Sequence, residues 1–298
     1  MLMKSSKILT LAVAFAILAS VMTPLIGMGP VANAAADDPV EVKIGLLNPI
    51  TGPIAVYAEA FTDAAEMAIA DLNAGQDTHS FSLVEGDSGC DGTTAATAAD
   101  SLISSGVAGI AGAACSGATL GALEVAKTGS TVMVSYASTS PALTVVDDDG
   151  YFFRVVPSDA QQGMAMASMA AAHGWQNPGI IYMTNDYGAG LADVVKAAYA
   201  AAGVDAMCVD IGYDQDNTDF SSQVEALAAA GCDSLIMVTY ATDGAALLEE
   251  MATQGVEGAT SPVCSSGCPF PVMGADGIAD MGFLAEFSDA SAAATVIA

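Results

Sequence analysis

A turn of small residues that carries Cys115 and Ser116 is the part of this sequence best suited to binding chemistry. Residues 107–119 have the pattern of a buried strand, Val107–Ala111, which runs into the turn and then into a helix that begins near Ser116. In an open parallel sheet, ligands bind beyond the carboxyl ends of the strands. A helix N-terminus at that place offers free N–H groups to an anion. The pattern therefore predicts a carboxylate site at Ser116, and the alternative is that this serine only caps the helix.

Enzymatic chemistry has little support in the rest of the sequence. Beyond the N-terminal segment the only histidines are His79 and His173, and there is no Gly-x-Ser-x-Gly motif. Phosphate-loop and dinucleotide-binding signatures are also absent. We therefore expect a protein that is not an enzyme and uses no cofactor.

Two short patterns resemble metal sites, and both are incomplete. Asp214-x-Asp216-x-Thr218 imitates a calcium loop, but Asp219 stands where that loop needs its central glycine. Cys264 and Cys268 could begin a zinc site, but no second Cys/His pair lies nearby. No metal is predicted. Met164, Met166 and Met169 are interpreted as core residues.

The charge of the chain excludes some classes of partner. The 298 residues carry a formal net charge of −28 at pH 7. Beyond the N-terminal segment the only basic residues are Lys43, Lys127, Arg154 and Lys196. Nucleic acids and anionic membrane surfaces both require basic patches, so neither is an expected partner. The acidity is interpreted as a device for solubility, consistent with a salty habitat.

The N-terminus has the features of an export signal. Lys4 and Lys7 precede an apolar run from Ile8 to about Ile26, and small residues at 32–34 suit signal peptidase. Residues 1–34 are predicted to be a signal peptide, with an uncleaved membrane anchor as the alternative. Either reading places the remaining chain outside the cytoplasm, in the periplasm or at the outer cell surface.

Six cysteines in an exported chain indicate disulfides. Three pairs follow from their positions relative to the predicted strands and loops: Cys90 with Cys115, Cys208 with Cys232, and Cys264 with Cys268.

Strand and helix patterns alternate from residue 41 onward, which predicts an α/β protein with parallel sheets flanked by helices. A break at Pro157 divides the chain into two Rossmann-like lobes, residues 35–157 and 158–287, whose strand ends would face one another across a cleft. In the second lobe we expect a strand at 261–264 and a final extended piece at 282–287. Residues 288–298 form a small-residue tail that ends without a closing element.

Several local motifs, in order along the chain, resemble one family. They are Thr51-Gly52-Pro53 followed by Tyr57, the pair Cys90 and Cys115, the turn Cys115-Ser116, the loop 135–141, Tyr151-x-x-Arg154, the turn Asp186-Tyr187-Gly188-x-Gly190, and Tyr240. Together they resemble the Leu/Ile/Val-type substrate-binding proteins of ABC importers, which are type I periplasmic binding proteins. The resemblance covers residues 41–287. It implies a protein that closes two lobes around an amino acid or a related solute and delivers it to a membrane permease.

The resemblance also implies a set of ligand-facing residues and a disulfide between Cys90 and Cys115. Ser116 and Thr139 would bind a carboxylate, and the carbonyl of Ala137 would bind an ammonium group. Three tyrosines would line the cleft. The full predicted set is Ser116, Ala137, Thr139, Tyr187, Tyr57, Tyr240 and Ser266.

Two departures from the family pattern leave alternatives open. The family's acidic residue for the ammonium group falls near Ser266, so Asp243 or Asp186 would have to replace it, or the solute would be an amide or carboxylate without an ammonium group. The family's final return to the first lobe is missing, so the type I fold is expected without its C-terminal part. The alternatives to an importer component are a ligand-sensing receptor subunit of the same fold and a non-functional truncated fragment.

Overall fold

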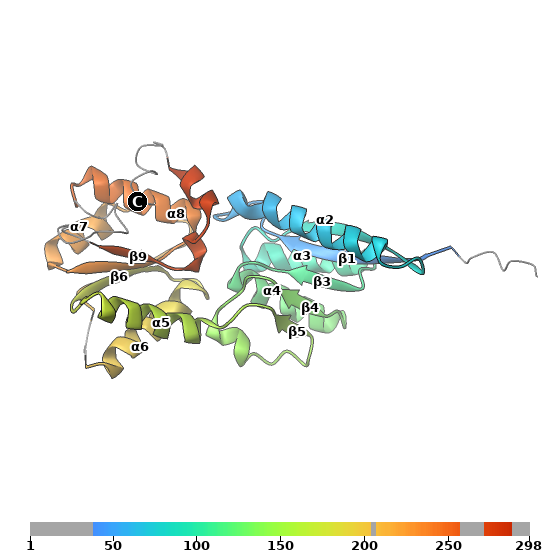
Figure 1. Cartoon of the computed structure of the whole chain (residues 1–298), viewed down its shortest axis with the longest axis horizontal. Helices are drawn as coiled ribbons and strands as arrows, with labels where there is room; N and C mark the ends of the chain where they lie inside the picture. The colour runs from blue at the N-terminus through green and yellow to red at the C-terminus, as the bar shows by residue number, and fades with distance from the viewer. Residues whose placement is uncertain (1–37, 204–206, 257–270, 288–298) are drawn as a thin grey trace, which may run out of the picture. The chain divides into compact units, whose positions relative to one another are not determined.

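The structure is a computed structural model that describes residues 38–203, 207–256 and 271–287 of the chain. One compact unit begins at Glu41 and contains two β-sheets (Figure 1). The strand orders are β2-β1-β3-β4-β5 in the first sheet and β7-β6-β8-β9 in the second. We call the part of the chain with the first sheet the first lobe and the part with the second sheet the second lobe. The predicted α/β class with parallel sheets is confirmed, while the lobe limits at residues 157 and 158 stay a prediction.

The first lobe alternates strands and helices along its length. Its elements are β1 (Val40–Asn48), η2 (Ala55–Tyr57), α2 (Ala58–Ala74), β2 (His79–Asp87), α3 (Gly92–Ser104), β3 (Gly109–Gly112), α4 (Ser116–Thr128), β4 (Met133–Ser135), η3 (Pro141–Thr144) and β5 (Phe152–Arg154). β3 lies between β1 and β4, and it pairs in parallel with both. The side chain of Asp91 caps α3 by accepting a hydrogen bond from the backbone N–H of Thr94, which fixes the start of that helix.

The second lobe repeats this scheme. Its elements are α5 (Asp159–Ala172), β6 (Pro178–Met183), α6 (Gly188–Ala201), β7 (Asp210–Tyr213), α7 (Ser221–Ala230), β8 (Ser234–Val238), α8 (Ala241–Thr253), β9 (Val272–Gly274), η4 (Asp276–Ile278) and η5 (Met281–Glu286). β6 pairs in parallel with β7 and β8, and β9 pairs in parallel with β8. Every residue of β8 is buried, as expected for a central strand of a parallel sheet that is covered on both faces.

The order of the strands determines where a ligand can bind. In each sheet the chain leaves one central strand toward one edge and later returns toward the other edge. The change of direction falls between β1 and β3 in the first lobe and between β6 and β8 in the second. The carboxyl ends of such strands are the usual ligand sites of open α/β sheets.

Small residues let the helices of the first lobe pack closely. α3 and α4 lie side by side, and a Cβ atom at Gly121 would collide with the backbone oxygen of Gly92. A larger residue at Gly121 would therefore push the two helices apart. Because α4 begins at the turn that carries Ser116, this contact helps to fix that turn.

Three predicted elements differ from the structure or lie outside it. The expected strand at 261–264 is outside the described residues, and the strand that pairs with β8 is β9, Val272–Gly274. Residues 282–287 are not extended, because Met281–Glu286 forms a 3-10 helix. Asp280 caps that helix by accepting from the N–H of Gly282, and Phe283 is buried, which explains the compact conformation. The hydrophobic pattern of Asp205–Ile211 also predicts a strand, whereas β7 begins only at Asp210.

The structure contains two disulfides, Cys90–Cys115 and Cys208–Cys232, and both are pairings that the sequence predicts. The proposed pair Cys264 and Cys268 lies outside the described residues. Cys90–Cys115 joins the segment after β2 to the N-cap of α4. The disulfide therefore holds the Ser116 turn against the segment that follows β2.

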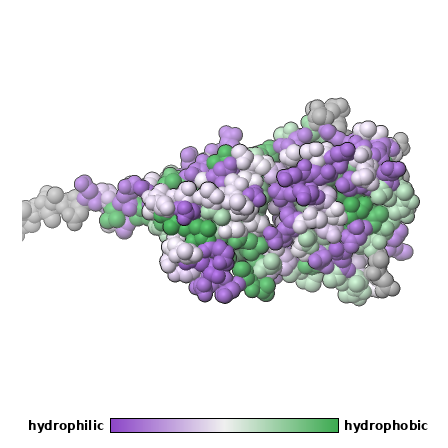
Figure 2. Space-filling model, turned by 180° about the vertical axis from the view of Figure 1, so that it is seen from behind, coloured by the Kyte–Doolittle hydropathy of each residue, from purple (hydrophilic) through white to green (hydrophobic). Residues whose placement is uncertain are grey.

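Hydrophilic residues cover much of the face seen in Figure 2, with hydrophobic residues in smaller groups. In the described part of the chain the ion pairs belong to Lys127 and Lys196, and their carboxylate partners are exposed. Such surface pairs contribute little to stability. No helix within the described ranges combines the length and the apolar composition needed to cross a membrane.

We expect the double replacement of Cys208 and Cys232 by serine to lower the free energy of unfolding by about 3 kcal/mol. The bridge spans a sequence separation of 24 residues, and opening a loop of this length restores that much chain entropy to the unfolded state. Urea unfolding followed by circular dichroism measures the change. The double alanine variant controls for the added hydroxyls, and a loss below 1 kcal/mol in both variants would contradict the prediction.

Candidate functional site

Loops that follow the strands of both sheets enclose one small cavity of about 110 Å³. Its lining residues come after β1, β3 and β4 in the first lobe and after β6, β8 and β9 in the second. They are Ile54, Tyr57, Phe61, Ala114, Ser116, Ala137, Thr139, Tyr187, Tyr240, Asp276 and Gly277. Six of the seven residues that the sequence nominates for ligand contact therefore lie around one cavity. The seventh, Ser266, lies outside the described residues.

One side of the cavity is the N-terminus of α4. Ser116 is buried at the first position of that helix, and the N-cap residue is Cys115. The Ser116 hydroxyl therefore does not act as the helix cap, which was the alternative interpretation of this residue. Its oxygen instead accepts a hydrogen bond from the backbone N–H of Ser140, at 3.2 Å. A helix N-terminus directed at a cavity favours a negatively charged group there.

Buried hydroxyl groups hold the loop after β4 against the turn after β3. The Ser135 hydroxyl donates to the carbonyl of Ala113 at 2.6 Å and accepts from the N–H of Ser138 at 2.9 Å. The hydroxyls of Thr119 and Ser138 lie 2.7 Å apart and are both within hydrogen-bond distance of the Ala113 carbonyl. These contacts fix the loop that presents Ala137 and Thr139 to the cavity. In the sequence this loop is marked by its resemblance alone, and no local pattern indicates the supporting role of these hydroxyls.

Thr139 and Asp159 are buried polar residues with unpaired oxygens. Within the described part of the chain, the hydroxyl of Thr139 and both carboxylate oxygens of Asp159 have no hydrogen-bond partner. The backbone N–H of Asp159, the first residue of α5, donates to the carbonyl of Thr139 at 2.9 Å, so the two residues are neighbours. Buried polar groups are normally paired, and leaving them unpaired costs free energy. The Thr139 hydroxyl lines the cavity and is therefore a candidate to bind a donor group supplied by a solute, with the carboxyl of Asp159 next to it.

The environment of Asp159 favours its neutral form. Burial, followed by the negative charge of Asp276, raises the pKa of this carboxyl to about 7. The Thr139 hydroxyl and the Arg154 guanidinium act in the opposite direction. The hydroxyl is near enough to lower the pKa, although no hydrogen bond of good geometry joins it to the carboxyl. A cationic group in the cavity would favour the ionised form.

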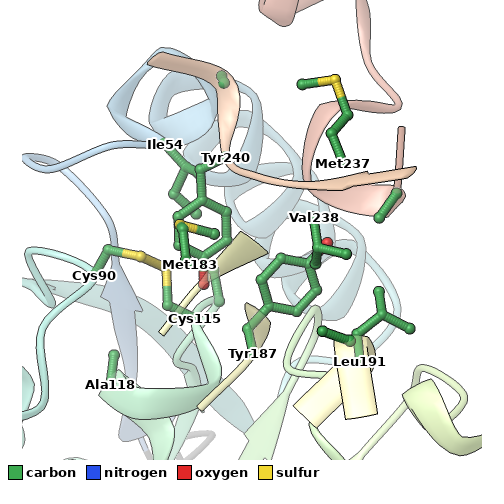
Figure 3. Close-up of a cluster of buried hydrophobic side chains, with 14 of the residues drawn as sticks. Ile54, Cys90, Cys115, Ala118, Met183, Tyr187, Leu191, Met237, Val238 and Tyr240 are labelled. Carbon is green, nitrogen blue, oxygen red and sulfur yellow. A yellow bond between two sulfur atoms is a disulfide. The ribbon is translucent and has the colours of Figure 1, made fainter. Parts of the chain in front are cut away.

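Two stacked tyrosines form the wall on the side of the second lobe. The rings of Tyr187 and Tyr240 are parallel within 7° with centroids 5.2 Å apart, and both are buried (Figure 3). The Tyr187 hydroxyl donates to Asp276 Oδ1 at 2.7 Å and accepts from the N–H of Gly277 at 3.1 Å. Tyr187 and Tyr240 are the N-cap residues of α6 and α8. Burial, with the charge of Asp276 next, holds the pKa of Tyr187 well above its usual range, so its hydroxyl stays neutral.

An apolar wall closes the cavity on the side of the first lobe. Ile54, Tyr57 and Phe61 belong to the segment that leads from β1 into α2. The hydroxyl of Tyr57 lies 3.5 Å from the carbonyl oxygen of Gly277. Burial and nearby acidic groups raise the pKa of Tyr57 to about 12, so this residue also presents a neutral hydroxyl. The cavity thus has an apolar wall, an anion-binding helix end and a carboxyl-lined side.

Sequence reasoning missed Asp276, which lines the cavity, and Asp159, which lies next to Thr139 outside the lining. Asp276 follows β9, a strand of three residues that the hydrophobic pattern did not reveal. Asp159 is the first residue of α5, just after Ser158, whose spacing to Gln161 predicts a helix cap. The cap itself is present, because the Ser158 hydroxyl accepts from the N–H of Ala160. An acidic residue that opens a helix is a common favourable feature, so nothing local marked Asp159 as functional.

The two carboxylates suggested as replacements for the family's acidic residue do not line the cavity. Asp243 is buried within the second lobe, where it accepts hydrogen bonds from the N–H of Tyr240 and from the hydroxyl of Tyr213. It forms the capping box of α8, so its oxygens are already bound. Asp186 belongs to a separate groove beside Pro141 and α6. Asp276 is the carboxylate that reaches the cavity.

The chain matches one family of binding proteins. The sequence model of the family described as "Periplasmic binding protein" matches residues 41–293. The Leucine-, isoleucine-, valine-, threonine-, and alanine-binding protein of Pseudomonas aeruginosa is 26% identical over 222 residues, which cover 72% of this chain and 58% of that protein. The Leu/Ile/Val/Thr-binding protein of Salmonella typhimurium is 27% identical over 229 residues, covering 75% and 61%. The chain therefore spans about three fifths of the length of these curated relatives.

Solved structures agree on the fold. A leucine-binding protein from Thermotoga maritima superimposes with a TM-score of 0.71 at 23% identity, covering 84% of this chain and 67% of that chain. A solute-binding protein of an ABC transporter from Rhodopseudomonas palustris, solved in complex with 4-hydroxybenzoate, gives 0.70 at 17% identity, covering 80% and 62%. The predicted type I periplasmic-binding-protein fold is confirmed by these likenesses.

We expect the stability of the unliganded protein to fall by roughly 1 kcal/mol between pH 6 and pH 8 because of Asp159. The folded state holds a proton on this carboxyl up to about pH 7, while the unfolded state releases it near the ordinary value of 3.8. The folded state therefore binds more protons over this interval, and its stability decreases as the pH rises through it. Urea unfolding at several pH values measures the slope.

Asp159→Asn should flatten this slope between pH 6 and pH 8. The pKa of Asp243 is raised to about 6, so most of its contribution falls below this interval. Asp87→Asn is a matched control, because hydrogen bonds from Thr51 and Gly89 outweigh burial and lower the pKa of Asp87. An unchanged slope in Asp159→Asn would contradict the assignment.

Proposed function

Because the chain belongs to the periplasmic binding protein family, we propose that it is the extracytoplasmic solute-binding component of an ABC importer and that it binds an amino acid between its lobes. The family is one of binding proteins, which agrees with the expectation that the chain is not an enzyme. The observation that carries the choice of an amino acid is the polarity of the cavity. The N-terminus of α4 lies on one side, and the carboxyl of Asp276 lies on another.

An α-amino acid at neutral pH has the two charges that this cavity complements. Its carboxylate would be held by the Ser116 hydroxyl and the N–H groups at the start of α4. Its ammonium group would be held by the carboxylate of Asp276, the carbonyl of Ala137 and the unpaired hydroxyl oxygen of Thr139, and the carboxyl of Asp159 next to Thr139 would add its negative charge. Charge-assisted hydrogen bonds of this kind are shorter and stronger than neutral ones.

The size and the walls of the cavity support a small solute with a modest apolar side chain. Its volume of about 110 Å³ is well below the roughly 300–1,000 Å³ of pockets for drug-sized ligands. Ile54, Tyr57 and Phe61 offer an apolar surface to the side chain. A relative from Pseudomonas aeruginosa is named for binding leucine, isoleucine, valine, threonine and alanine, which supports the same class of solute. An amide or an aromatic acid without an ammonium group would leave the carboxylate of Asp276 without a cationic partner.

Contacts between the lobes support binding by closure. The side-chain amide of Gln215 in the second lobe donates to the carbonyl of Cys90 in the first, at 3.3 Å. The hydroxyl of Thr242 donates to the carbonyl of Pro53 at 3.2 Å. Neither pair lines the cavity. Rotation of the lobes about the crossover between β5 and α5 would break these contacts and admit a solute, as in hinge closure around ligands.

The location outside the cytoplasm and the permease partner follow from the proposed role. The family and the two disulfides are typical of an oxidising, extracytoplasmic compartment. The predicted signal segment, residues 1–34, lies outside the described residues. A ligand-sensing receptor subunit of the same fold remains the alternative role, and a sensor gene beside this one, in place of permease genes, would favour it.

We expect L-leucine or L-alanine to raise the melting temperature of the protein, and we expect Asp276→Asn to weaken their binding by about 30-fold or more. A hydrogen bond to a charged group typically contributes about 1.5–3 kcal/mol, and about 2 kcal/mol corresponds to a 30-fold change in affinity. Asparagine keeps an acceptor for the Tyr187 hydroxyl, so the fold should be retained. Calorimetry measures the dissociation constants, and Asp210→Asn is the control because Asp210 is an exposed partner of Lys196.

The carboxylic acid 4-methylpentanoate tests the role of the ammonium group, since it is leucine without that group. It should bind the native protein much more weakly than leucine does, and Asp276→Asn should change its affinity less than threefold. Equal binding of leucine and 4-methylpentanoate, or binding of 4-hydroxybenzoate alone, would overturn the proposed solute class.

A further inference from the structure

Arg154 makes an unusual set of contacts for a cation in so acidic a chain. It is the last residue of β5, and its side chain is partly buried. Its Nη1 donates to the carbonyl oxygens of Ser138 at 3.3 Å and Ser140 at 2.9 Å, and its Nη2 donates to the hydroxyl of Thr144 at 2.5 Å. The ion pairs in the described ranges belong to Lys127 and Lys196, whereas Arg154 is directed at neutral oxygens.

The two carbonyls that Arg154 binds lie on either side of Thr139. The carbonyl of Thr139 itself accepts from the N–H of Asp159 at 2.9 Å, and the N–H of Ser140 donates to the Ser116 hydroxyl. Three successive carbonyls of the cavity loop are therefore bound, two of them by the same guanidinium. The fixed fork of a guanidinium suits this task, because it orients two acceptors at once, whereas an ammonium group acts as a point charge.

Arg154 is also the cation that acts on the carboxyl of Asp159. The charged and titratable groups around that carboxyl are Asp276 on η4, Tyr240 at the start of α8, and Arg154 on β5. The acidic neighbour and burial favour the protonated carboxyl, and Arg154 opposes them. Loss of the guanidinium would leave Asp159 neutral over a wider range of pH.

We propose that Arg154 is a positioning residue for solute binding, which holds the Thr139 loop at the cavity and keeps the Asp159 carboxylate available to a cationic group of the solute. The role of Arg154 in solute binding rests on the proposed function. Its role in holding the Thr139 loop concerns the unliganded protein alone. Thr139 lines the cavity, whereas Arg154 and Asp159 do not, so Arg154 acts through the Thr139 loop and through the charge of Asp159 rather than by contact with the solute.

The test compares Arg154→Gln, Arg154→Lys and the control Lys127→Gln. Lys127 is also a cation of the first lobe, and it binds the Asp147 carbonyl and nearby carboxylates away from the cavity. In the unliganded protein, hydrogen exchange followed by mass spectrometry should show faster exchange in the peptide that covers residues 138–142 for Arg154→Gln. In Arg154→Gln, the pH interval over which the free energy of unfolding decreases should also lie at higher pH than in the native protein. Lys127→Gln should change neither measurement.

In the liganded protein, the dissociation constant of L-leucine is measured by calorimetry from pH 6 to pH 8.5. Arg154→Gln should weaken binding about tenfold or more at pH 7 and recover part of the loss at higher pH, where Asp159 ionises. Arg154→Lys keeps the charge and loses the fork, so it should bind more weakly than the native protein with a nearly native pH profile. A role in stability alone would lower the melting temperature and leave the pH profile unchanged.

The outcomes separate the two proposals. If the native protein binds neither L-leucine nor L-alanine, the proposed function fails, and the exchange and stability measurements still decide the role of Arg154 in the loop. If Arg154→Gln matches the native protein in loop exchange, in the pH dependence of stability and in the affinity for L-leucine, the inference is wrong. If Arg154→Gln does not fold, Arg154→Lys becomes the deciding variant. Native affinity for L-leucine together with native loop exchange in Arg154→Lys would then overturn the inference.

Discussion

The architecture depends on one constraint, which is that a parallel strand must be followed by a crossover to the other end of the sheet. All the carboxyl ends then lie at one edge, and the helices that follow them begin there. In this chain the constraint operates twice, once in each sheet. Loops after six of the strands come together around one cavity, together with the N-terminus of α4. The polar character of the cavity follows from this geometry, because backbone N–H groups at helix starts remain free to bind a ligand.

The rigid parts of the site are made by groups that do not face the cavity. Buried hydroxyls of Ser135, Ser138 and Thr119 join the two loops of the first lobe, and the Cys90–Cys115 disulfide holds the turn behind them. Hydrogen bonds of this kind contribute individually about 0.5–1.5 kcal/mol to stability, but together they leave the loop few alternative conformations. Among the described residues, the hydroxyl of Thr139 and the carboxyl of Asp159 are unpaired beside the cavity, and the hydroxyls of Tyr199 and Thr239 are unpaired in the second lobe. The two loops of the first lobe are thus held by paired groups, while the neighbouring groups of Thr139 and Asp159 remain unpaired.

Sequence reasoning could predict the parts of the site that local patterns determine. The strand and turn before Ser116, the alternation of strands and helices, and the positions of four cysteines all depend on spacing within short windows. Asp276 could not be found this way, because β9 has three residues and gains its identity only by pairing with β8. The 3-10 helix at Met281–Glu286 depends on a tertiary effect, the burial of Phe283, and on a local effect, the cap at Asp280. The roles of Asp159 and Arg154 depend on contacts that only the folded chain creates.

The partly protonated carboxyl of Asp159 has a consequence for the heat of binding. At pH 7 roughly half of the unliganded molecules carry a proton there, and an ammonium group that requires the carboxylate would displace it. Each solute molecule captured would then release a fraction of a proton to the buffer. The apparent enthalpy would differ between buffers with different heats of ionisation, such as phosphate and Tris. Through the same exchange, acidification around the protein would favour release of the solute, so capture would be coupled to the acidity of the surrounding medium.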